Sequence, residues 1–173
     1  MFPLVHTRDA LRIAREAMES AVRGAEYRLP PRLPNELLRH RAGAFVTLVK
    51  GGKLRACWGT LESQHPHLAA EIAAAARGVC SRDTRFPPLR ADEVRSVRII
   101  LTVVLSPAQP ATASQIRPRE HGVLVRWKER SAVVLPHEGR TVRRMLALAR
   151  QKAGIPDGEP VEIYTFRVQT VQE

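Results

Sequence analysis

Apolar residues dominate two short segments near the middle of the chain, residues 43–50 and 53–60. Gly51 and Gly52 separate these segments, and paired glycines supply the positive φ angles that a tight hairpin turn requires. Both faces of the first segment carry apolar side chains, which is typical of a strand in a sheet covered on both sides. The pattern therefore predicts an antiparallel β-hairpin over residues 43–60.

Helical periodicity of apolar positions predicts helices over residues 7–23, 66–79 and 141–153. We expect Thr7 to cap the first helix, Pro66 to lie in the first turn of the second, and Gly154 to end the third. The proline-rich residues 28–34 cannot continue a helix and predict an extended connector, followed by a short helical turn over residues 35–41.

Further strands are predicted at residues 97–105 and 161–171, with a second hairpin formed by residues 122–127 and 131–135. Residues 82–89 and 108–120 lack periodicity and are predicted loops. We predict an α+β fold with a mostly antiparallel sheet and flanking helices. We also predict that residues 1–173 form a single domain. This domain can comprise two sub-lobes built around the hairpins 43–60 and 122–135.

The net positive charge of the chain indicates one class of partner, a polyanion. The chain has 173 residues, 28 Lys and Arg against 17 Asp and Glu, and a formal net charge of +11. Such a balance attracts polyanions, although an arginine-rich composition also gives a merely solvated basic surface. The candidate nucleic-acid patch lies on or beside the last predicted helix and comprises Arg140, Arg143, Arg144 and Arg150. Aromatic residues make up only 5% of the chain, which argues against a single-strand binder.

The two cysteines, Cys57 and Cys80, form no disulfide framework and no Cys-x-x-Cys motif. This usage is typical of a reducing compartment. The N-terminus lacks a signal-peptide apolar core, and no uncharged apolar run of about 18 residues occurs in the chain. We therefore expect a cytoplasmic protein that does not enter the membrane.

The hexapeptide at residues 54–59, Leu-Arg-Ala-Cys-Trp-Gly, is the principal candidate site. Strand alternation places Arg55, Cys57 and Gly59 on one face and the other three side chains on the opposite face. A guanidinium on the same face favours the thiolate of Cys57, and Gly59 leaves that face open. The alternative is that Cys57 is a small buried hydrophobic residue, as unpaired cysteines often are.

If Cys57 acts as an enzymatic nucleophile, it requires a base. His121, at the start of the second hairpin, is the candidate. His65 and His67 flank a proline where a helix begins, so they are poorly placed to join Cys57 as metal ligands. We expect no metal and no cofactor. A non-catalytic binding module that uses its arginines to dock a protein or a nucleic acid is the competing hypothesis.

Several short motifs together resemble the AMMECR family, whose prokaryotic members are known as protein A of the AmmeMemoRadiSam system. They are the Gly-Ala-Phe-Val-Thr-Leu of residues 43–48, the residues 52–61 around Cys57, Arg-Phe-Pro-Pro-Leu at 85–89, Leu-Ser-Pro at 105–107, His-Gly at 121–122, Leu-Pro at 135–136 and Lys-Ala-Gly at 152–154. The resemblance extends from about residue 8 to residue 173. Ala56 and Trp58 replace a glycine and an isoleucine of the family signature, on the face away from Cys57. Leu101 stands where the family typically carries a glutamate.

The resemblance implies two unequal lobes with the signature beside a cleft between them. It also implies association with a radical S-adenosylmethionine protein and a Memo-like protein, but it supplies no reaction. Catalytic roles would fall to Cys57, Arg55 and His121. Substrate contacts would fall to Gly59, Arg85 and Phe86.

Overall fold

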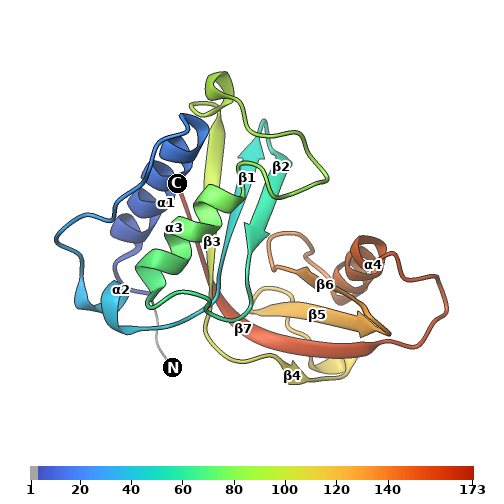
Figure 1. Cartoon of the computed structure of the whole chain (residues 1–173). Helices are drawn as coiled ribbons and strands as arrows, with labels where there is room; N and C mark the ends of the chain where they lie inside the picture. The colour runs from blue at the N-terminus through green and yellow to red at the C-terminus, as the bar shows by residue number, and fades with distance from the viewer. Residues whose placement is uncertain (1–3) are drawn as a thin grey trace. The chain divides into compact units, whose positions relative to one another are not determined.

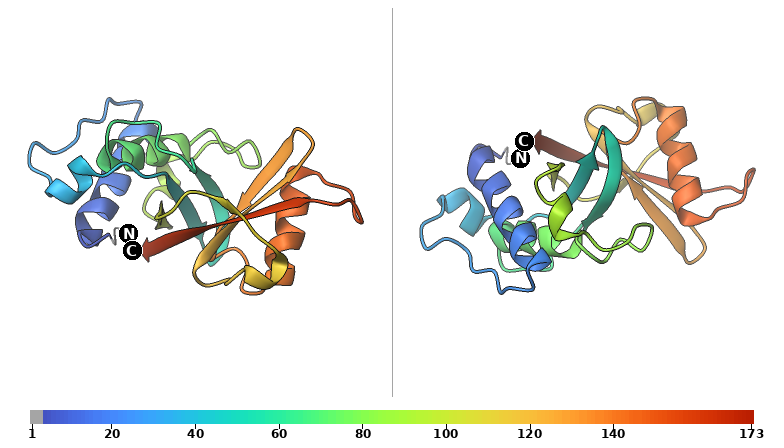
Figure 2. Two further views of the ribbon diagram at one scale, coloured as in Figure 1. Left: turned by 90° about the horizontal axis from the view of Figure 1, so that it is seen from below. Right: turned by 90° about the horizontal axis from the view of Figure 1, so that it is seen from above.

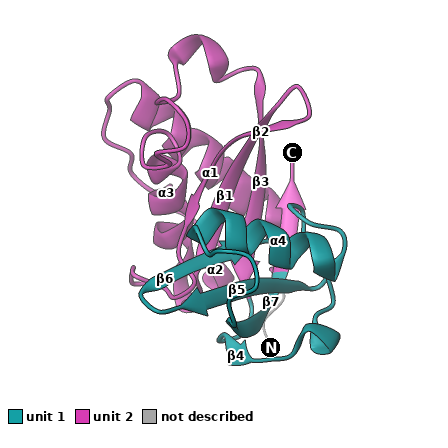
Figure 3. Ribbon diagram, turned by 90° about the vertical axis from the view of Figure 1, so that its right-hand side faces the viewer, with its two compact units in different colours: residues 1, 105–168 teal, residues 2–104, 169–173 magenta. Residues whose placement is uncertain are grey.

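The computed structural model describes residues 4–173 and divides them into two compact units (Figure 3). Unit 1 comprises Leu105–Val168, and unit 2 comprises residues 4–104 together with Gln169–Glu173. Strand β7 (Glu162–Gln172) runs through both units. The described residues contain four α-helices and antiparallel strand pairs, so the predicted α+β class is confirmed.

In unit 2, strand β1 (Ala44–Lys50) lies between β2 (Lys53–Gly59) and β3 (Val97–Val104), and both pairings are antiparallel. The last residues of β7 follow β3: the hydroxyls of Thr102 and Thr170 lie 3.2 Å apart. β2 is the outer strand beside β1. Its outer backbone edge is therefore open to contacts from loops.

Helices α1 (Thr7–Val22) and α3 (Leu68–Gly78) lie side by side on one face of β1–β3 (Figures 1 and 2). The strand positions facing them include Val46, Trp58 and Leu101, which lie in one row across the three strands. A Cβ atom added at Gly78 of α3 would come within 2.3 Å of the Trp58 ring, so the indole packs directly on this glycine. The buried apolar residues of this layer include Ile13, Ala17, Met18, Val46, Leu48, Leu68, Ile72, Ile99 and Leu101.

In unit 1, strand β5 (His121–Trp127) pairs with β6 (Arg130–Val134) and with β7, and the short β4 (Gln109–Pro110) also pairs with β7. Helix α4 (Val142–Ala153) packs on β5 and β6. Its ends follow the sequence rules, because Thr141 Oγ1 accepts a hydrogen bond from Arg144 N at 3.2 Å and Gly154 has φ of 61°. The core of unit 1 comprises Ile116, Val123, Val125, Val134, Met145, Ala149 and Ile155.

Most predicted elements are confirmed, with three local corrections. Thr7 is the first residue of α1 rather than its cap, and the actual N-cap, His6, provides no side-chain bond. α3 begins after Pro66, where His67 Nδ1 accepts a hydrogen bond from Ala70 N at 3.2 Å. Residues 108–120 are not merely a loop, because they contain β4 and a 3₁₀ turn. The predicted short turn forms α2 (Asn35–Arg39).

Candidate functional site

A β-bulge interrupts β2 at Arg55. Leu48 of β1 pairs with Ala56, but the next residue, Val49, pairs with Leu54, which leaves Arg55 with no Cα partner in β1. A bulge inserts one extra residue into an edge strand and turns its side chain out of the regular alternation. The prediction that Arg55 and Cys57 share a face assumed an unbroken strand, and the bulge at Arg55 interrupts that alternation.

The Arg55 guanidinium holds a loop against the edge of β2. Its Nε and Nη2 atoms donate to the two carboxylate oxygens of Glu93 at 3.0 and 2.8 Å. Its Nη1 and Nη2 atoms also donate to the carbonyls of Pro87 and Pro88 at 3.1 and 3.3 Å. Both side chains of the ion pair are only 12% exposed. Arg55 therefore clamps residues 87–93, and its role as the electrostatic partner of Cys57 stays a prediction.

The Glu93 carboxylate accepts hydrogen bonds from three residues. Besides Arg55, it accepts hydrogen bonds from Lys50 Nζ at 2.9 Å and from the backbone N of Arg90 at 3.1 Å. The hydrogen bonds from Arg55 and then Lys50 hold the pKa of Glu93 far below its usual range. These donors therefore favour the charged form of the Glu93 carboxylate.

A second arginine–carboxylate pair lies on the same loop. The backbone N of Cys57 donates to Asp83 Oδ2 at 2.8 Å, and Arg85 donates to both oxygens of Asp83 at 2.9 and 2.8 Å. Burial raises the pKa of Asp83, but the bonds from Arg85 and the Cys57 amide outweigh burial, so the net shift is downward. Asp83 therefore fixes the backbone of β2 directly at the cysteine.

Cys57 is half-buried and lies on the face of β2 away from α1 and α3. Its cross-strand partner is the fully buried Thr47, whose Oγ1 donates a hydrogen bond to Cys57 Sγ at 3.2 Å. Because the Cys57 amide points outward to Asp83, the Thr47–Cys57 pair is of the non-hydrogen-bonded type, in which side chains approach closely. A hydroxyl donor at the sulfur favours the thiolate form.

The remaining unit 2 candidates have defined surroundings. A Cβ atom at Gly59 would lie 2.1 Å from the Ala44 carbonyl oxygen and 2.8 Å from Cδ1 of Phe45. Glycine here permits close approach of β1, and the prediction that it leaves the face open is wrong because Phe45 occupies that space. The Arg85 guanidinium lies 5.6 Å from the centroid of the half-buried Phe86 ring. Ala56 is buried on the helix-covered face, as the sequence predicted. Leu101 lies on that same face, away from Cys57.

The other candidates belong to unit 1. His121 begins β5, and its Nδ1 accepts a hydrogen bond from Arg117 N at 3.2 Å. Arg150 donates to the carbonyls of Pro156 and Glu159 at 3.4 and 2.8 Å, so it ties down the loop after α4. The remaining arginines of the predicted patch, Arg140, Arg143 and Arg144, are exposed. The pairing of His121 with Cys57 stays a prediction.

Sequence reasoning missed Thr47, Asp83 and Glu93. Thr47 could have been found, because it is a polar residue in an otherwise apolar strand. The two acids lie in a segment without periodicity, which gives no signal. Within residues 4–173, no group of three or more His, Cys, Asp or Glu residues is arranged to hold a metal ion. No helix in that range has the length and apolar character needed to cross a membrane.

Comparison with known proteins gives the family of this chain. The AMMECR1 family profile matches residues 11–171, and the chain belongs to the AMMECR1 family. A protein of Thermotoga maritima is 42% identical over 142 residues, covering 79% of this chain and 81% of that protein. A protein of Methanothermobacter thermautotrophicus is 33% identical over 183 residues, covering 96% and 93%.

A solved structure shares the architecture. The crystal structure of the uncharacterized protein PH0010 from Pyrococcus horikoshii matches with a TM-score of 0.83 and 26% sequence identity. The match covers 95% of this chain and 89% of that chain. The family and the fold are therefore shown, whereas these relatives carry no named activity.

We expect Glu93→Gln to lower the free energy of unfolding near neutral pH by about 2–4 kcal/mol, since it leaves the Arg55 charge uncompensated. Because folding lowers the Glu93 pKa, its stabilisation is complete above the unfolded value and is lost as the pH falls below about 4.5. Urea unfolding at a series of pH values should show a flatter acid limb in the variant. The exposed Glu129→Gln serves as control, and equal pH profiles for both variants would contradict the role of the clamp.

Proposed function

We propose that this AMMECR1-family chain is a cytoplasmic component that acts through the Cys57 thiol, together with a radical S-adenosylmethionine protein and a Memo-like protein. The observation that carries the thiol role is the 3.2 Å hydrogen bond from Thr47 Oγ1 to Cys57 Sγ. The two partners are proposed from the resemblance of the sequence motifs to the AmmeMemoRadiSam system. The two parts of the proposal are tested separately.

The environment of Cys57 suits a nucleophile. The thiol is half-buried, so an electrophile can reach it, and the Thr47 hydroxyl stabilises negative charge on sulfur. Asp83 fixes the strand by accepting the Cys57 amide hydrogen. Gly59, Arg85 and Phe86 are assigned to substrate contacts beside the sulfur.

Cys80 provides an internal standard for this proposal. It is buried at the end of α3, and burial raises the pKa of its thiol to about 11. Its sulfur lies 3.4 Å from the Ala76 carbonyl oxygen, within the helix layer. A thiol in such surroundings remains protonated and inert near neutral pH. The two cysteines therefore differ in thiol reactivity, which is the property that the proposal concerns.

Near neutral pH, iodoacetamide should alkylate Cys57 at least about tenfold faster than Cys80, because thiolate content and access control the rate. Peptide mass spectrometry over time measures both sites in the same sample. Thr47→Val, which keeps the side-chain shape but removes the donor, should slow Cys57 several-fold and leave Cys80 unchanged. A Cys57 that reacts only after denaturation, or one indifferent to Thr47→Val, would overturn the thiol role.

The partner proposal predicts a physical complex. The affinity-tagged chain, co-expressed with the radical S-adenosylmethionine protein and the Memo-like protein of the same organism, should retain at least one of them through gel filtration. Cys57→Ser should form the same complex, since the thiol is assigned to chemistry rather than docking. Elution of all three proteins as separate peaks at low salt would contradict the partnership.

A second candidate function, nucleic-acid binding, is favoured by one feature of α4. Its first turn contains Arg143 and Arg144, both exposed, and no acidic residue. A helix N-terminus disfavours positive charge, so local stability does not account for these arginines. Phosphate contacts would account for them.

If α4 binds nucleic acid, an oligouridylate should bind at low salt with an affinity that falls steeply as salt rises. Arg143→Glu with Arg144→Glu should reduce that affinity about tenfold or more, as measured by fluorescence anisotropy. Glu substitutions at Arg90 and Arg95, exposed residues of unit 2, give the same change in net charge. An equal loss in both double variants would show general charge attraction and reject the α4 site.

A further inference from the structure

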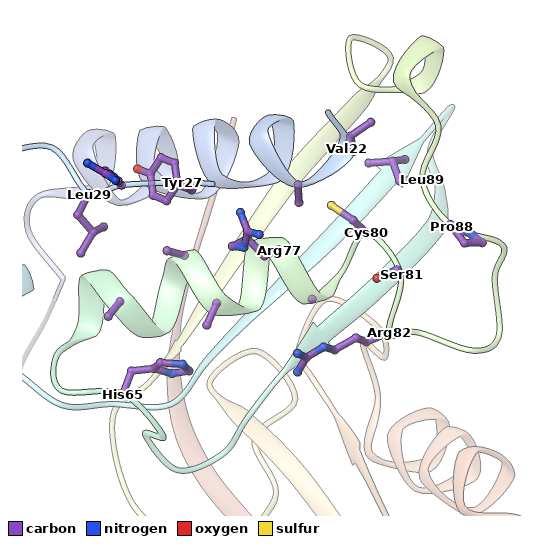
Figure 4. Close-up of a pocket in the computed structure, with 16 residues that line it drawn as sticks. Val22, Tyr27, Leu29, His65, Arg77, Cys80, Ser81, Arg82, Pro88 and Leu89 are labelled. Carbon is purple, nitrogen blue, oxygen red and sulfur yellow. The ribbon is translucent and has the colours of Figure 1, made fainter. Parts of the chain in front are cut away.

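A groove of about 1000 Å³ lies in unit 2 along the outer face of α3 (Figure 4). Its floor consists of small residues on that helix face, Ala70, Ala73, Ala74 and Gly78. The last turn of α1 and residues 27–29 of the connector form one wall. Residues that precede and follow α3 form the other wall. The groove lies over the helix layer, whereas Cys57 lies on the opposite face of the strands.

The charges that line the groove have one sign. Arg28, Arg77 and Arg82 line it together with His65, and none of its lining residues within 4–173 is an aspartate or glutamate. All three arginines are exposed. Arg28 forms an exposed ion pair with Glu26, which solvent weakens. The groove therefore presents cations to a ligand at separate points along its length.

The walls are held by contacts already formed. His65 Nδ1 lies 3.0 Å from the carboxylate of Glu71, which is only 2% exposed. On one side of α3 in Figure 4, His65 lies near one end and Arg82 near the other. Arg77 Nη1 donates to the Ala25 carbonyl at 3.1 Å and so ties the connector to α3. Pro88 also lines the groove, and its carbonyl oxygen accepts a hydrogen bond from Arg55. A ligand would meet a preorganised surface.

We propose that this groove binds an extended acidic segment of a partner protein. Arg77 lies in the last turn of α3, Arg82 follows that helix, and Arg28 belongs to the opposite wall. Cations on separate segments of the groove suit several charges along a chain rather than one compact anion. The alanine and glycine floor allows a peptide backbone to approach closely. Of the groove-lining residues within 4–173, Tyr27 is the one Phe, Tyr or Trp, and its hydroxyl donates to Glu16 at 3.3 Å. A stacking platform for nucleotide bases is thus lacking.

The test uses a fluorescein-labelled peptide of about eight residues with alternating Glu and Ala, long enough in extended form to span α3. Anisotropy at about 50 mM salt measures its affinity for the whole chain. Arg77→Glu with Arg82→Glu should weaken binding about tenfold or more. Ala74→Trp, which fills the floor without changing charge, should also weaken it. The matched control, Arg95→Glu with Arg98→Glu at exposed positions of unit 2 outside the groove, should change the affinity less than about twofold.

Circular dichroism first establishes that each variant is folded, and Ala74→Trp keeps the test decisive if the loss of the Arg77–Ala25 contact unfolds the charge variant. Three results would overturn the proposal: no binding at low salt, equal binding of a Gln and Ala peptide, or equal loss in the Arg95 and Arg98 control. A uridylate of about eight nucleotides that binds more tightly, through Arg77 and Arg82, would instead identify a nucleic-acid groove.

Discussion

The ion pair between Arg55 and Glu93 is the contact on which the candidate site depends. Arg55 is the bulged residue of β2, and its guanidinium binds both oxygens of Glu93 and two proline carbonyls of one loop. That loop carries Asp83, which binds the Cys57 amide, and Pro88, which closes the groove over α3. A nearly buried ion pair adds little net stability over an apolar contact, but breaking it leaves an uncompensated charge. Its contribution is therefore the position of the loop.

The two cysteines show how local surroundings separate residues of one type. Cys80 lies within the helix layer, and burial raises the pKa of its thiol. Cys57 lies on an edge strand, is half-buried, and receives a hydrogen bond from Thr47. The first environment favours the neutral thiol, whereas the second leaves a half-buried sulfur beside a hydroxyl donor. This contrast, more than the presence of a nearby arginine, supports a chemical role for Cys57.

Membership in the AMMECR1 family accounts for the fold but does not define a reaction, because a fold can carry many different activities. Trp58 illustrates how one strand contributes both to packing and to the candidate site. The indole packs on Gly78 of α3, where a Cβ atom would collide with it. Trp58 therefore belongs to the layer between strands and helices. Cys57 lies on the other face of the strands.

The sequence by itself determined the α+β class, both hairpins, the ends of α4 and the packing role of Ala56, because these depend on residues close together in the chain. Only the tertiary structure decided the partners of the site. Glu93 is 38 positions from Arg55, and Asp83 is 26 positions from Cys57, in segments with no periodic pattern. Strand alternation also cannot reveal a bulge, since an extra residue changes the hydrogen-bond register without a distinctive residue type. The sequence thus located the strand that carries Cys57, and long-range contacts determined what each side chain there binds.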